Sequence, residues 1–348
     1  MARFAIVFIS LIALVQPARA VVHTVDAGGG GDYLTIQEGI NACSSGDTVL
    51  VAPGTYTDAG NRDLEFFGVN LVLMSDGGPD VTTIDCEGAG RGFRIHDDED
   101  ESSAIIGFTI RDASGAGSHG GGMYLAEVGT HVVNCIIENC TAAWGGGASI
   151  ARYSGTTPDP TIENCVFRDN TAEDGGGLFN FGSSPTITGC VFDGNSSSTG
   201  AGGGIGCNSG SATPTITNCT IVNSGNAGIN CYYMSPTITN TIVAFSHDAP
   251  SWGVGIKCSG SSNPTITHCF VFQNEDGDSL CGDYYDNRFE DPLFCDVMNG
   301  DSRLCANSPC IQANNPWGET VGALAEGCGD CDAPVESATW STIKAVYR

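Results

Sequence analysis

The central part of the chain repeats one short pattern. Copies that open with Pro-Thr-Ile lie 22 to 29 residues apart and begin at Pro160, Pro185, Pro214, Pro236 and Pro264. Two further copies have weaker openings, at Ile105 and Val132. Repeats of this length are typical of stacked supersecondary units that bury a continuous core along one axis. The repeat therefore predicts a solenoid rather than one globular core.

The apolar positions inside one repeat indicate strands. Counted from the first isoleucine, inward-type residues stand at offsets of 0, 3 and 5, as in Ile162, Cys165 and Phe167. This spacing does not fit one strand, whose side chains alternate with a period of two. It fits two strands joined by a two-residue bend, and a glycine-rich entry then leads into a third alternating segment, as in 204–207. We therefore expect an all-β, single-stranded parallel β-helix with three strands in each coil.

The same inward position recurs in every coil, so like side chains should stack in ladders. The first ladder comprises Phe108, Cys135, Cys165, Cys190, Cys219, Thr241 and Cys269. The second comprises Leu125, Ile150, Asn180, Cys207, Cys231 and Cys258. Stacked strands lie ~4.8 Å apart, slightly beyond the ~3.5–4.5 Å between the Cβ atoms of a disulfide. We expect most ladder cysteines to be free thiols that act as small apolar side chains.

The first residues read as an export signal. Arg3 supplies a positive start, residues 4–15 are apolar, and Ala18-Arg19-Ala20 fits a signal peptidase site. Residues 1–20 are therefore predicted to be a signal peptide, so that the mature chain begins at Val21 and is secreted or lies at the cell surface. No later stretch has the length of a membrane-spanning helix.

The predicted solenoid runs from 21 to 332 and has a cap at its N-terminal end. Residues 31–56 fit such a cap, with Thr35 and Glu38 spaced as a capping box in front of a short helix. We expect the second coil to begin at 81–86.

A cysteine-rich segment, residues 291–332, is predicted to close the C-terminal end, and a tail of different composition, 333–348, follows. Its cysteines break the ladder spacing, so we expect disulfides here; they are Cys295, Cys305, Cys310, Cys328 and Cys331. The Cys-Gly-Asp-Cys sequence at 328–331 has the spacing of a redox pair. No thioredoxin-type βαβ pattern surrounds it, which favours a structural role.

The cap and the repeats together carry a family resemblance. The motifs are Asn164-Cys165, Asn218-Cys219 and the glycine triplets 120–122, 145–147, 175–177 and 202–204. The chain resembles pectin-lyase-like right-handed parallel β-helix repeat proteins of the exported bacterial type, and its repeats are similar to those of polymorphic outer-membrane proteins. The resemblance covers roughly residues 22 to 330. It implies a right-handed solenoid and little about activity, because one fold hosts many functions.

The charge balance limits the partners. The chain has 13 basic and 40 acidic residues, a formal net charge of −27. Nucleic acids and anionic membranes need a basic surface, so neither is expected as a partner. The charge is compatible with calcium or a neutral polysaccharide, and we expect a monomer.

Catalytic motifs of the resembled enzymes are missing, so no catalytic residue is predicted and any substrate-binding residue stays unknown. Ser118-His119-Gly120 lacks the first glycine of a Gly-His-Gly motif. Four outward positions on consecutive coils alternate in charge: Arg111, Glu138, Arg168 and Asp193. This alternation predicts a row of surface ion pairs. The alternative is that one of the arginines is catalytic.

Residues 96–101, His-Asp-Asp-Glu-Asp-Glu, are the best metal candidate. Their oxygen donors suit calcium, but they lack the spacing of an EF-hand, which favours a solvated loop. The sequence predicts no cofactor, and bound calcium is the one alternative that stays open.

Two features point to binding. Thr-x-Thr recurs on four consecutive coils, at 186–188, 215–217, 237–239 and 265–267, as an outward hydroxyl array that would suit a sugar chain or ice. Threonine is also simply a good outward strand residue. Aromatic residues on the outer face would favour a glycan; the candidates are Tyr124, Phe179, Tyr232 and Tyr233.

Export, acidity and the missing motifs favour a non-catalytic structural or adhesive surface protein, with a polysaccharide or a cell-surface protein as its partner. The first alternative is a polysaccharide lyase or hydrolase. The second is a glycan- or ice-binding protein that uses the Thr-x-Thr face.

Overall fold

The computed structural model describes residues 20–153, 159–247 and 254–331. The predicted tail, 333–348, and all but the last residue of the predicted signal peptide, 1–20, lie outside the described residues. Within the described residues, no helix is long and apolar enough to cross a membrane.

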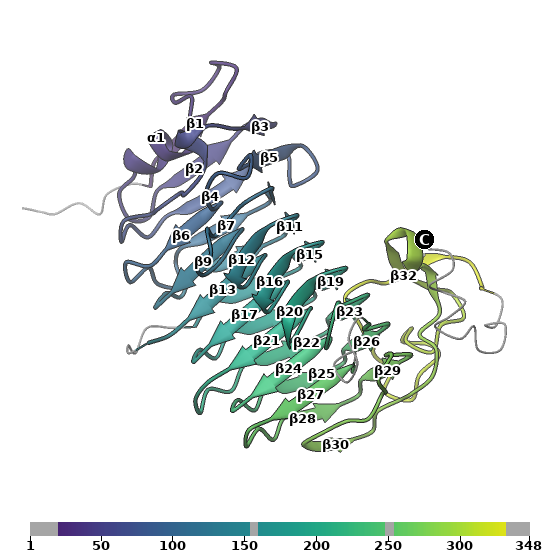
Figure 1. The fold of residues 1–348 in the computed structure, drawn as a ribbon. Helices are drawn as coiled ribbons and strands as arrows, with labels where there is room; N and C mark the ends of the chain where they lie inside the picture. Colours follow the sequence, from purple (N-terminus) through teal and green to yellow (C-terminus); the bar gives the residue numbers. More distant parts are fainter. Residues whose placement is uncertain (1–19, 154–158, 248–253, 332–348) are drawn as a thin grey trace, which may run out of the picture.

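Short strands stack in register along one axis and form three long parallel sheets (Figure 1). The first sheet has eleven strands: β1 (Val22–Val25), β2 (Thr48–Val51), β4 (Val72–Ser75), β7 (Ala104–Ile106), β10 (His131–Val133), β14 (Thr161–Glu163), β18 (Thr186–Thr188), β22 (Thr215–Thr217), β25 (Thr237–Thr239), β28 (Thr265–Thr267) and β30 (Asp283–Tyr285). Each coil contributes one strand to it, as a three-stranded parallel β-helix requires.

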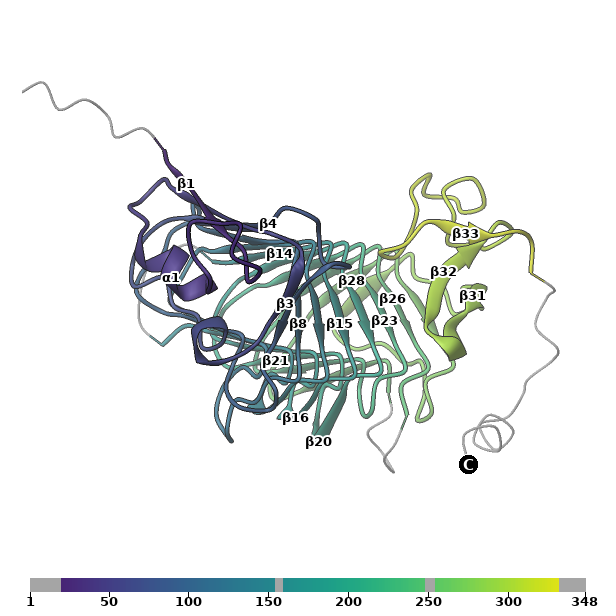
Figure 2. The same ribbon diagram turned by 90° about the horizontal axis from the view of Figure 1, so that it is seen from above.

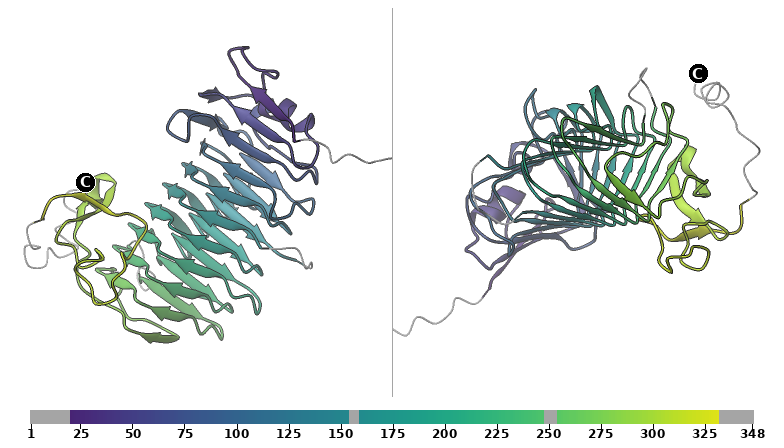
Figure 3. Two further views of the ribbon diagram at one scale, coloured as in Figure 1. Left: turned by 180° about the vertical axis from the view of Figure 1, so that it is seen from behind. Right: turned by 90° about the horizontal axis from the view of Figure 1, so that it is seen from below.

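The other two long sheets take one strand from most coils. The second sheet holds β3 (Gly54–Tyr56), β5 (Thr82–Asp85), β8 (Thr109–Arg111), β11 (Ile136–Glu138), β15 (Val166–Arg168), β19 (Val191–Asp193), β23 (Thr220–Val222), β26 (Ile242–Ala244) and β29 (Phe270–Phe272). The third sheet holds β6 (Phe93–Ile95), β9 (Met123–Ala126), β13 (Ala148–Ala151), β17 (Leu178–Phe181), β21 (Ile205–Asn208), β24 (Ile229–Tyr232) and β27 (Ile256–Ser259). Figure 3 shows the stack from behind and from below.

The predicted ladders are confirmed. In the bend between the first and second sheets, Cys165 and its equivalents point inward and are buried as free thiols. The residue before each cysteine needs a left-handed backbone, with φ of +53° at Asn164 and +51° at Asn218. Asparagine and glycine adopt this conformation most easily, which explains the recurring Asn-Cys pair. Behind the bend, the Phe167 and Phe192 rings stack with centroids 4.8 Å apart.

The glycine triplets have a steric cause. Gly145 has φ of +69°, and a Cβ added there would lie 2.1 Å from the carbonyl oxygen of Ala148. A Cβ on Gly147 would lie 2.5 Å from the carbonyl oxygen of Gly177 in the next coil. The triplets therefore let successive coils approach closely as each enters the third sheet.

A third ladder, of polar residues, follows the second sheet and was not predicted. Its members stand eight positions after the first isoleucine of each coil, and include Cys140, Asn170, Asn195, Ser224, Ser246 and Asn274. Asn170 is fully buried; its Oδ1 accepts from Cys140 N (2.9 Å) and its Nδ2 donates to Ile137 O (2.9 Å). Asn195 repeats the pattern one coil later by donating to Phe167 O (2.8 Å). These amides satisfy turn groups that the sheets leave unpaired.

Asn170→Ala is expected to lower the free energy of unfolding by about 1–3 kcal/mol, because buried groups of Cys140 and Ile137 lose their partner. Urea unfolding followed by far-UV circular dichroism measures the change. Asn263→Ala is the matched control, because Asn263 is exposed and donates to a surface carboxylate; its expected effect is within about 0.5 kcal/mol. Equal effects of the two changes would contradict a structural role for the polar ladder.

The N-terminal cap contains the predicted helix. Helix α1 (Ile36–Asn41) begins after Thr35, whose side chain accepts from Glu38 N while the Glu38 carboxylate accepts from Thr35 N, so the capping box is confirmed. A 3-10 turn, η1 (Ala59–Asn61), follows β3. The prediction that the second coil starts at 81–86 was wrong. That segment contains β5, which is the middle strand of a coil that starts at β4. Strand β1 adds a rung before β2 in the first sheet, and α1 lies between these two strands in the sequence.

Three coils carry a fourth strand that was not predicted. The side sheet consists of β12 (Thr141–Trp144), β16 (Thr171–Asp174) and β20 (Ser196–Ala201). It lies between the second and third sheets, in segments that the sequence presents only as polar loops of variable length (Figure 2). The side sheet widens the solenoid beside β9, β13 and β17.

The cysteine-rich segment, predicted to close the C-terminal end, packs against the side of the solenoid. It forms a sheet of β31 (Phe294–Asp296), β32 (Asp301–Cys305) and β33 (Glu326–Cys328), with a 3-10 turn, η2 (Val297–Asn299). Figure 1 shows this segment beside β23, β26 and β29. Its apolar side chains cover outward residues of the last coils, among them Val222, Ile242, Ala244 and Phe270. The last rung of the first sheet, β30, keeps Tyr284 and Tyr285 exposed.

The disulfides lie near this end. Cys295–Cys328 and Cys305–Cys331 link the cysteine-rich segment, as predicted, whereas Cys310 is a buried free thiol. Cys328 and Cys331 therefore pair with other partners and not with each other. The expectation of a free thiol was wrong at Cys258, which pairs with Cys281. Cys281 belongs to no regular strand, so its side chain is free of the parallel stacking that keeps ladder thiols apart.

Candidate functional site: an aromatic face on the third sheet

Outward side chains of three consecutive strands of the third sheet share one column. Tyr124 on β9, Ser149 on β13 and Phe179 on β17 are direct partners in the parallel register. The segment that leads into β9 lies beside the side sheet, where His119 pairs with Trp144 of β12. The solenoid thereby brings the His119 imidazole over the third sheet.

His119 is at the centre of an aromatic cluster. Its ring stacks on Trp144 with centroids 4.8 Å apart and lies 5.5 Å from the Tyr124 ring. Tyr153, just beyond β13, presents its ring edge at 6.4 Å, and Phe179 lies below at 6.5 Å. We call His119, Tyr124, Trp144 and Tyr153 the aromatic face.

Hydrogen bonds fix the imidazole. His119 Nδ1 shares a hydrogen bond with Ser149 Oγ (3.1 Å), and Nε2 shares one with the Tyr153 hydroxyl (3.3 Å). The Tyr153 and Tyr124 hydroxyls lie 3.4 Å apart. Glu127 holds Tyr153 by accepting from its backbone N–H (2.7 Å). The ring orientation is therefore set from both sides.

The local electrostatics keep this face uncharged. Burial, helped by the charge of Arg91, lowers the pKa of His119, so the imidazole is neutral at pH 7. Burial, together with the contact to Tyr153, raises the pKa of Tyr124. Arg91 itself is occupied, since it donates to the carbonyl oxygens of His119 (2.9 Å) and Gly115 (3.2 Å).

Solvent reaches only some of these groups. Tyr153 is 56% exposed and Trp144 37%, whereas Ser149 is fully buried and Phe179 is 3% exposed. Ser149 is therefore placed to orient His119 and not to attack a substrate. The exposed part offers ring surfaces for stacking, two phenolic hydroxyls, and an imidazole that can accept a proton.

The lowered pKa predicts a pH effect on stability. The unfolded chain takes up a proton on this histidine near the ordinary value of about 6.5, while the folded chain resists it, so stability contributed by neutral His119 is lost as pH falls through that range. Wild-type stability should therefore fall more between pH 7 and pH 5 than that of His119→Gln, as measured by urea unfolding at each pH. His131→Gln, on the first sheet, should retain the wild-type pH dependence. A His119→Gln variant with that same dependence would contradict this assignment.

Comparison with known proteins settles the family. A sequence model described as a right-handed β-helix region matches residues 92–271 and 200–300, which is more than half of the chain. The chain belongs to the right-handed β-helix family. The predicted handedness and the predicted pectin-lyase-like fold are thereby confirmed.

Several solved structures are similar to this chain at low sequence identity. The pectate lyase Pel9A is 13% identical, with a TM-score of 0.53 over 89% of this chain and 97% of that one. A pectin methylesterase from Aspergillus niger is 16% identical over 78% of this chain and 86% of that one, with a TM-score of 0.38. A mannuronic-acid-specific lyase from human gut microbiota is 11% identical over 82% and 73%, with a TM-score of 0.40. No curated protein sequence matches.

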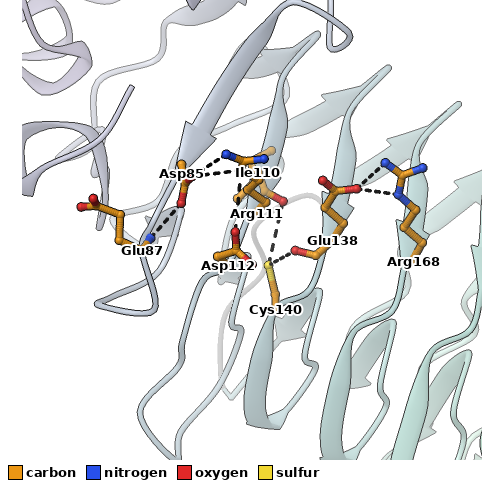
Figure 4. Close-up of polar contacts among 8 residues, drawn as sticks. All are labelled: Asp85, Glu87, Ile110, Arg111, Asp112, Glu138, Cys140 and Arg168. Carbon is orange, nitrogen blue, oxygen red and sulfur yellow. Dashed lines mark hydrogen bonds and ion pairs between the residues drawn. The ribbon is translucent and has the colours of Figure 1, made fainter. Parts of the chain in front are cut away.

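The predicted row of alternating charges on this β-helix is confirmed in part, since one ion pair, Glu138–Arg168, lies within it (Figure 4). Arg111 Nη2 lies 2.7 Å from the Asp85 carboxylate of the preceding coil, and Arg168 pairs with Glu138. Arg111 is thus held by Asp85, which lies in register one coil before the row, and Arg168 is held by Glu138 of the row. Both contacts favour the structural interpretation over a catalytic arginine. Asp193, the last member, accepts from Asn223 (2.8 Å), and burial raises its pKa.

The acidic segment 96–101 uses its carboxylates to fold its own loop. Glu99 is 1% exposed and accepts from the backbone N–H groups of Gly68 and Asp97. Asp100 accepts from the N–H and hydroxyl of Ser102. These bonds agree with a hydrogen-bonded loop, and the segment contributes to neither of the ligand groups found among the described residues.

The Thr-x-Thr face lies on the first sheet as expected, with Thr186, Thr215, Thr237 and Thr265 in one column. Thr186 and Thr237 are exposed, and the rest are half-buried. Tyr232 and Tyr233 lie at the end of β24 as an edge-to-face pair, with centroids 4.5 Å apart. They share the third sheet with the aromatic face but lie several coils away (Figure 1).

Sequence reasoning named His119, Tyr124 and Phe179 separately and missed Trp144, Ser149 and Tyr153. One signal was available. His119 and Ser149 are 30 residues apart, and Tyr124 and Tyr153 are 29 apart, which is about one coil in this part of the chain. Residues one coil apart are neighbours in a solenoid.

Proposed function

We propose that this β-helix protein is an exported surface protein that binds a neutral polysaccharide at the aromatic face, without cleaving it. The observation that carries the proposal is the exposure of Trp144 and Tyr153 around an oriented, uncharged imidazole. Aromatic rings stack on the apolar faces of sugars, while the hydroxyls and the imidazole supply hydrogen bonds.

Charge supports a neutral ligand. The chain has a net charge of −27. Arg91, beside His119, already donates hydrogen bonds to the backbone carbonyl oxygens of His119 and Gly115. A polyanionic polymer would meet long-range repulsion, and Arg94, the register partner of Tyr124, is paired with the Glu65 carboxylate (2.8 Å). Similarity to polysaccharide-active enzymes supports only the fold, since these activities belong to those proteins.

The second candidate is cleavage of such a polymer, and one observation favours it. A neutral imidazole shares a hydrogen bond with the exposed Tyr153 hydroxyl at Nε2 (3.3 Å), and an imidazole and a phenol can pass a proton between them. No carboxylate pair of the kind that glycoside hydrolases use stands within the aromatic face.

The test uses the mature protein, residues 21–348, with immobilised plant, algal and bacterial polysaccharides, with and without calcium. We expect retention on at least one neutral polymer, no calcium requirement and no product. Retention on none would overturn the binding proposal. New reducing ends or unsaturated products that disappear in His119→Gln would instead establish the second candidate.

A further inference from the structure

A second cluster of reactive side chains lies in the N-terminal cap, far from the aromatic face. His23 is on β1, Cys43 follows the C-cap of α1, and Asp47 precedes β2. One donor atom from each lies within 4.8 Å of the others: an imidazole nitrogen, a thiol sulfur and a carboxylate oxygen. Three different segments thus converge at the N-terminal end of the solenoid, where Figure 1 shows β1, α1 and β2 together.

The imidazole lacks a good partner. His23 Nε2 is buried with no hydrogen bond of acceptable geometry, and its distance to Asp47 Oδ2 is 3.5 Å. The Tyr33 ring packs beside it, with centroids 5.9 Å apart. The imidazole nitrogen therefore faces the Asp47 carboxylate without a close hydrogen bond to it.

The Asp47 carboxylate is held in place by hydrogen bonds, and the Cys43 thiol is not part of a disulfide. Asp47 accepts from Val21 N (2.7 Å) at Oδ1 and from Ser44 N (2.8 Å) at Oδ2, which fixes its carboxylate beside His23. Cys43 is a free, half-buried thiol whose Sγ approaches the carbonyl oxygen of Gly39 at 3.4 Å.

We propose that His23, Cys43 and Asp47 bind a divalent transition metal, with zinc as the ion that fits best. Zinc takes nitrogen, sulfur and oxygen donors at about 2.0–2.3 Å in tetrahedral geometry, and three protein ligands leave one position for water. Calcium is disfavoured, because it prefers a shell of oxygen atoms. The donors close in on the ion by side-chain rotation, and the Cys43 proton is released as the thiolate binds.

Binding would join β1 to the segment between α1 and β2. The bond from Asp47 to Val21 N places the predicted start of the mature chain against the same carboxylate. The ion would therefore stabilise the cap that closes the first coil. This site is independent of the proposed polysaccharide face.

The first test needs no variant. Among the free cysteines that the structure describes, Cys43 is the only one that is not buried, so a thiol reagent added to the native, untagged mature protein should label it alone. We expect zinc to protect Cys43 from labelling, and cobalt to give one equivalent of a tetrahedral spectrum with a thiolate charge-transfer band. Unchanged labelling with zinc, or no such cobalt band, would overturn the proposal.

Variants then assign the ligands. Cys43→Ser and His23→Gln should each weaken zinc binding by more than about tenfold in calorimetric titration. His96→Gln is the matched control, because His96 also stands near two carboxylates, those of Glu65 and Asp97, but outside the cluster. Far-UV circular dichroism confirms that each variant folds. Equal binding by all three variants would show that zinc binds elsewhere and would reject the site.

Discussion

Phe167→Ala is expected to lower the free energy of unfolding by about 3–5 kcal/mol. Phe167 is fully buried between coils, and its ring stacks on Phe192 with centroids 4.8 Å apart and an interplanar angle of 3°. Removing the ring leaves a cavity inside a stack whose neighbours are fixed by the strand register, so the site has little freedom to collapse. Urea unfolding at pH 7, followed by far-UV circular dichroism, measures the loss.

The matched control for this change is Phe289→Ala. Phe289 is 53% exposed near the C-terminal end, so removing its ring should change the unfolding free energy by less than about 0.5 kcal/mol. A loss under about 1 kcal/mol for Phe167→Ala would mean that the interior of the stack is not close-packed, and would count against the ladder description.

Trp144→Ala is expected to weaken polysaccharide binding by about 30-fold or more, which corresponds to about 2 kcal/mol. Trp144 supplies the largest ring of the aromatic face and stacks on His119, so its removal takes away a sugar platform and uncovers one face of the imidazole. Affinity electrophoresis on the polymer that retains the wild type best measures the change.

The control for Trp144 is an aromatic residue outside the face. Tyr284→Ala removes a ring that is 55% exposed on the last rung of the first sheet. This variant should bind as the wild type does. Similar losses in the two variants would show that exposed aromatic residues contribute to binding wherever they lie, and that the aromatic face is not the site.

The ladders were predictable because the inward positions obey a strict pattern. A residue such as Cys165 recurs at one offset in every coil, and the register of parallel strands then stacks it on its equivalents. The capping box at Thr35 was predictable for a similar reason, since its partners are three residues apart. Local spacing and repeat periodicity carried these predictions.

The side sheet and the aromatic face depend on loop length, which the repeat does not fix. Trp144 reaches His119 only because β12 extends the coil sideways, and the sequence of this segment has no alternation that predicts a strand. Tyr153 lies beyond the end of β13, so no ladder position includes it. Contacts between coils of unequal length have to be read from the structure.

The sequence contains one indication of the lateral packing of the cysteine-rich segment: the outward residues of the second sheet become apolar in the last coils. Upstream coils place charged residues there, such as Arg111 and Glu138, whereas the last coils place Val222 and Ala244. Apolar residues on an outer face need a cover, and the segment after β30 supplies it. The change in character from charged to apolar predicts that something covers these coils, and the structure shows what covers them.

Hydroxyl-radical footprinting of the mature protein with its best-retained polysaccharide shows where the polymer binds, because it reports which side chains the bound polymer shields. It therefore tests directly whether binding occurs at the aromatic face. If the polymer binds at the aromatic face, we expect Trp144 and Tyr153 to become protected from oxidation, whereas Tyr284 and Tyr285 should stay reactive. Protection of the last rung or of the tyrosine pair at Tyr232 and Tyr233, with Trp144 still oxidised, would contradict it.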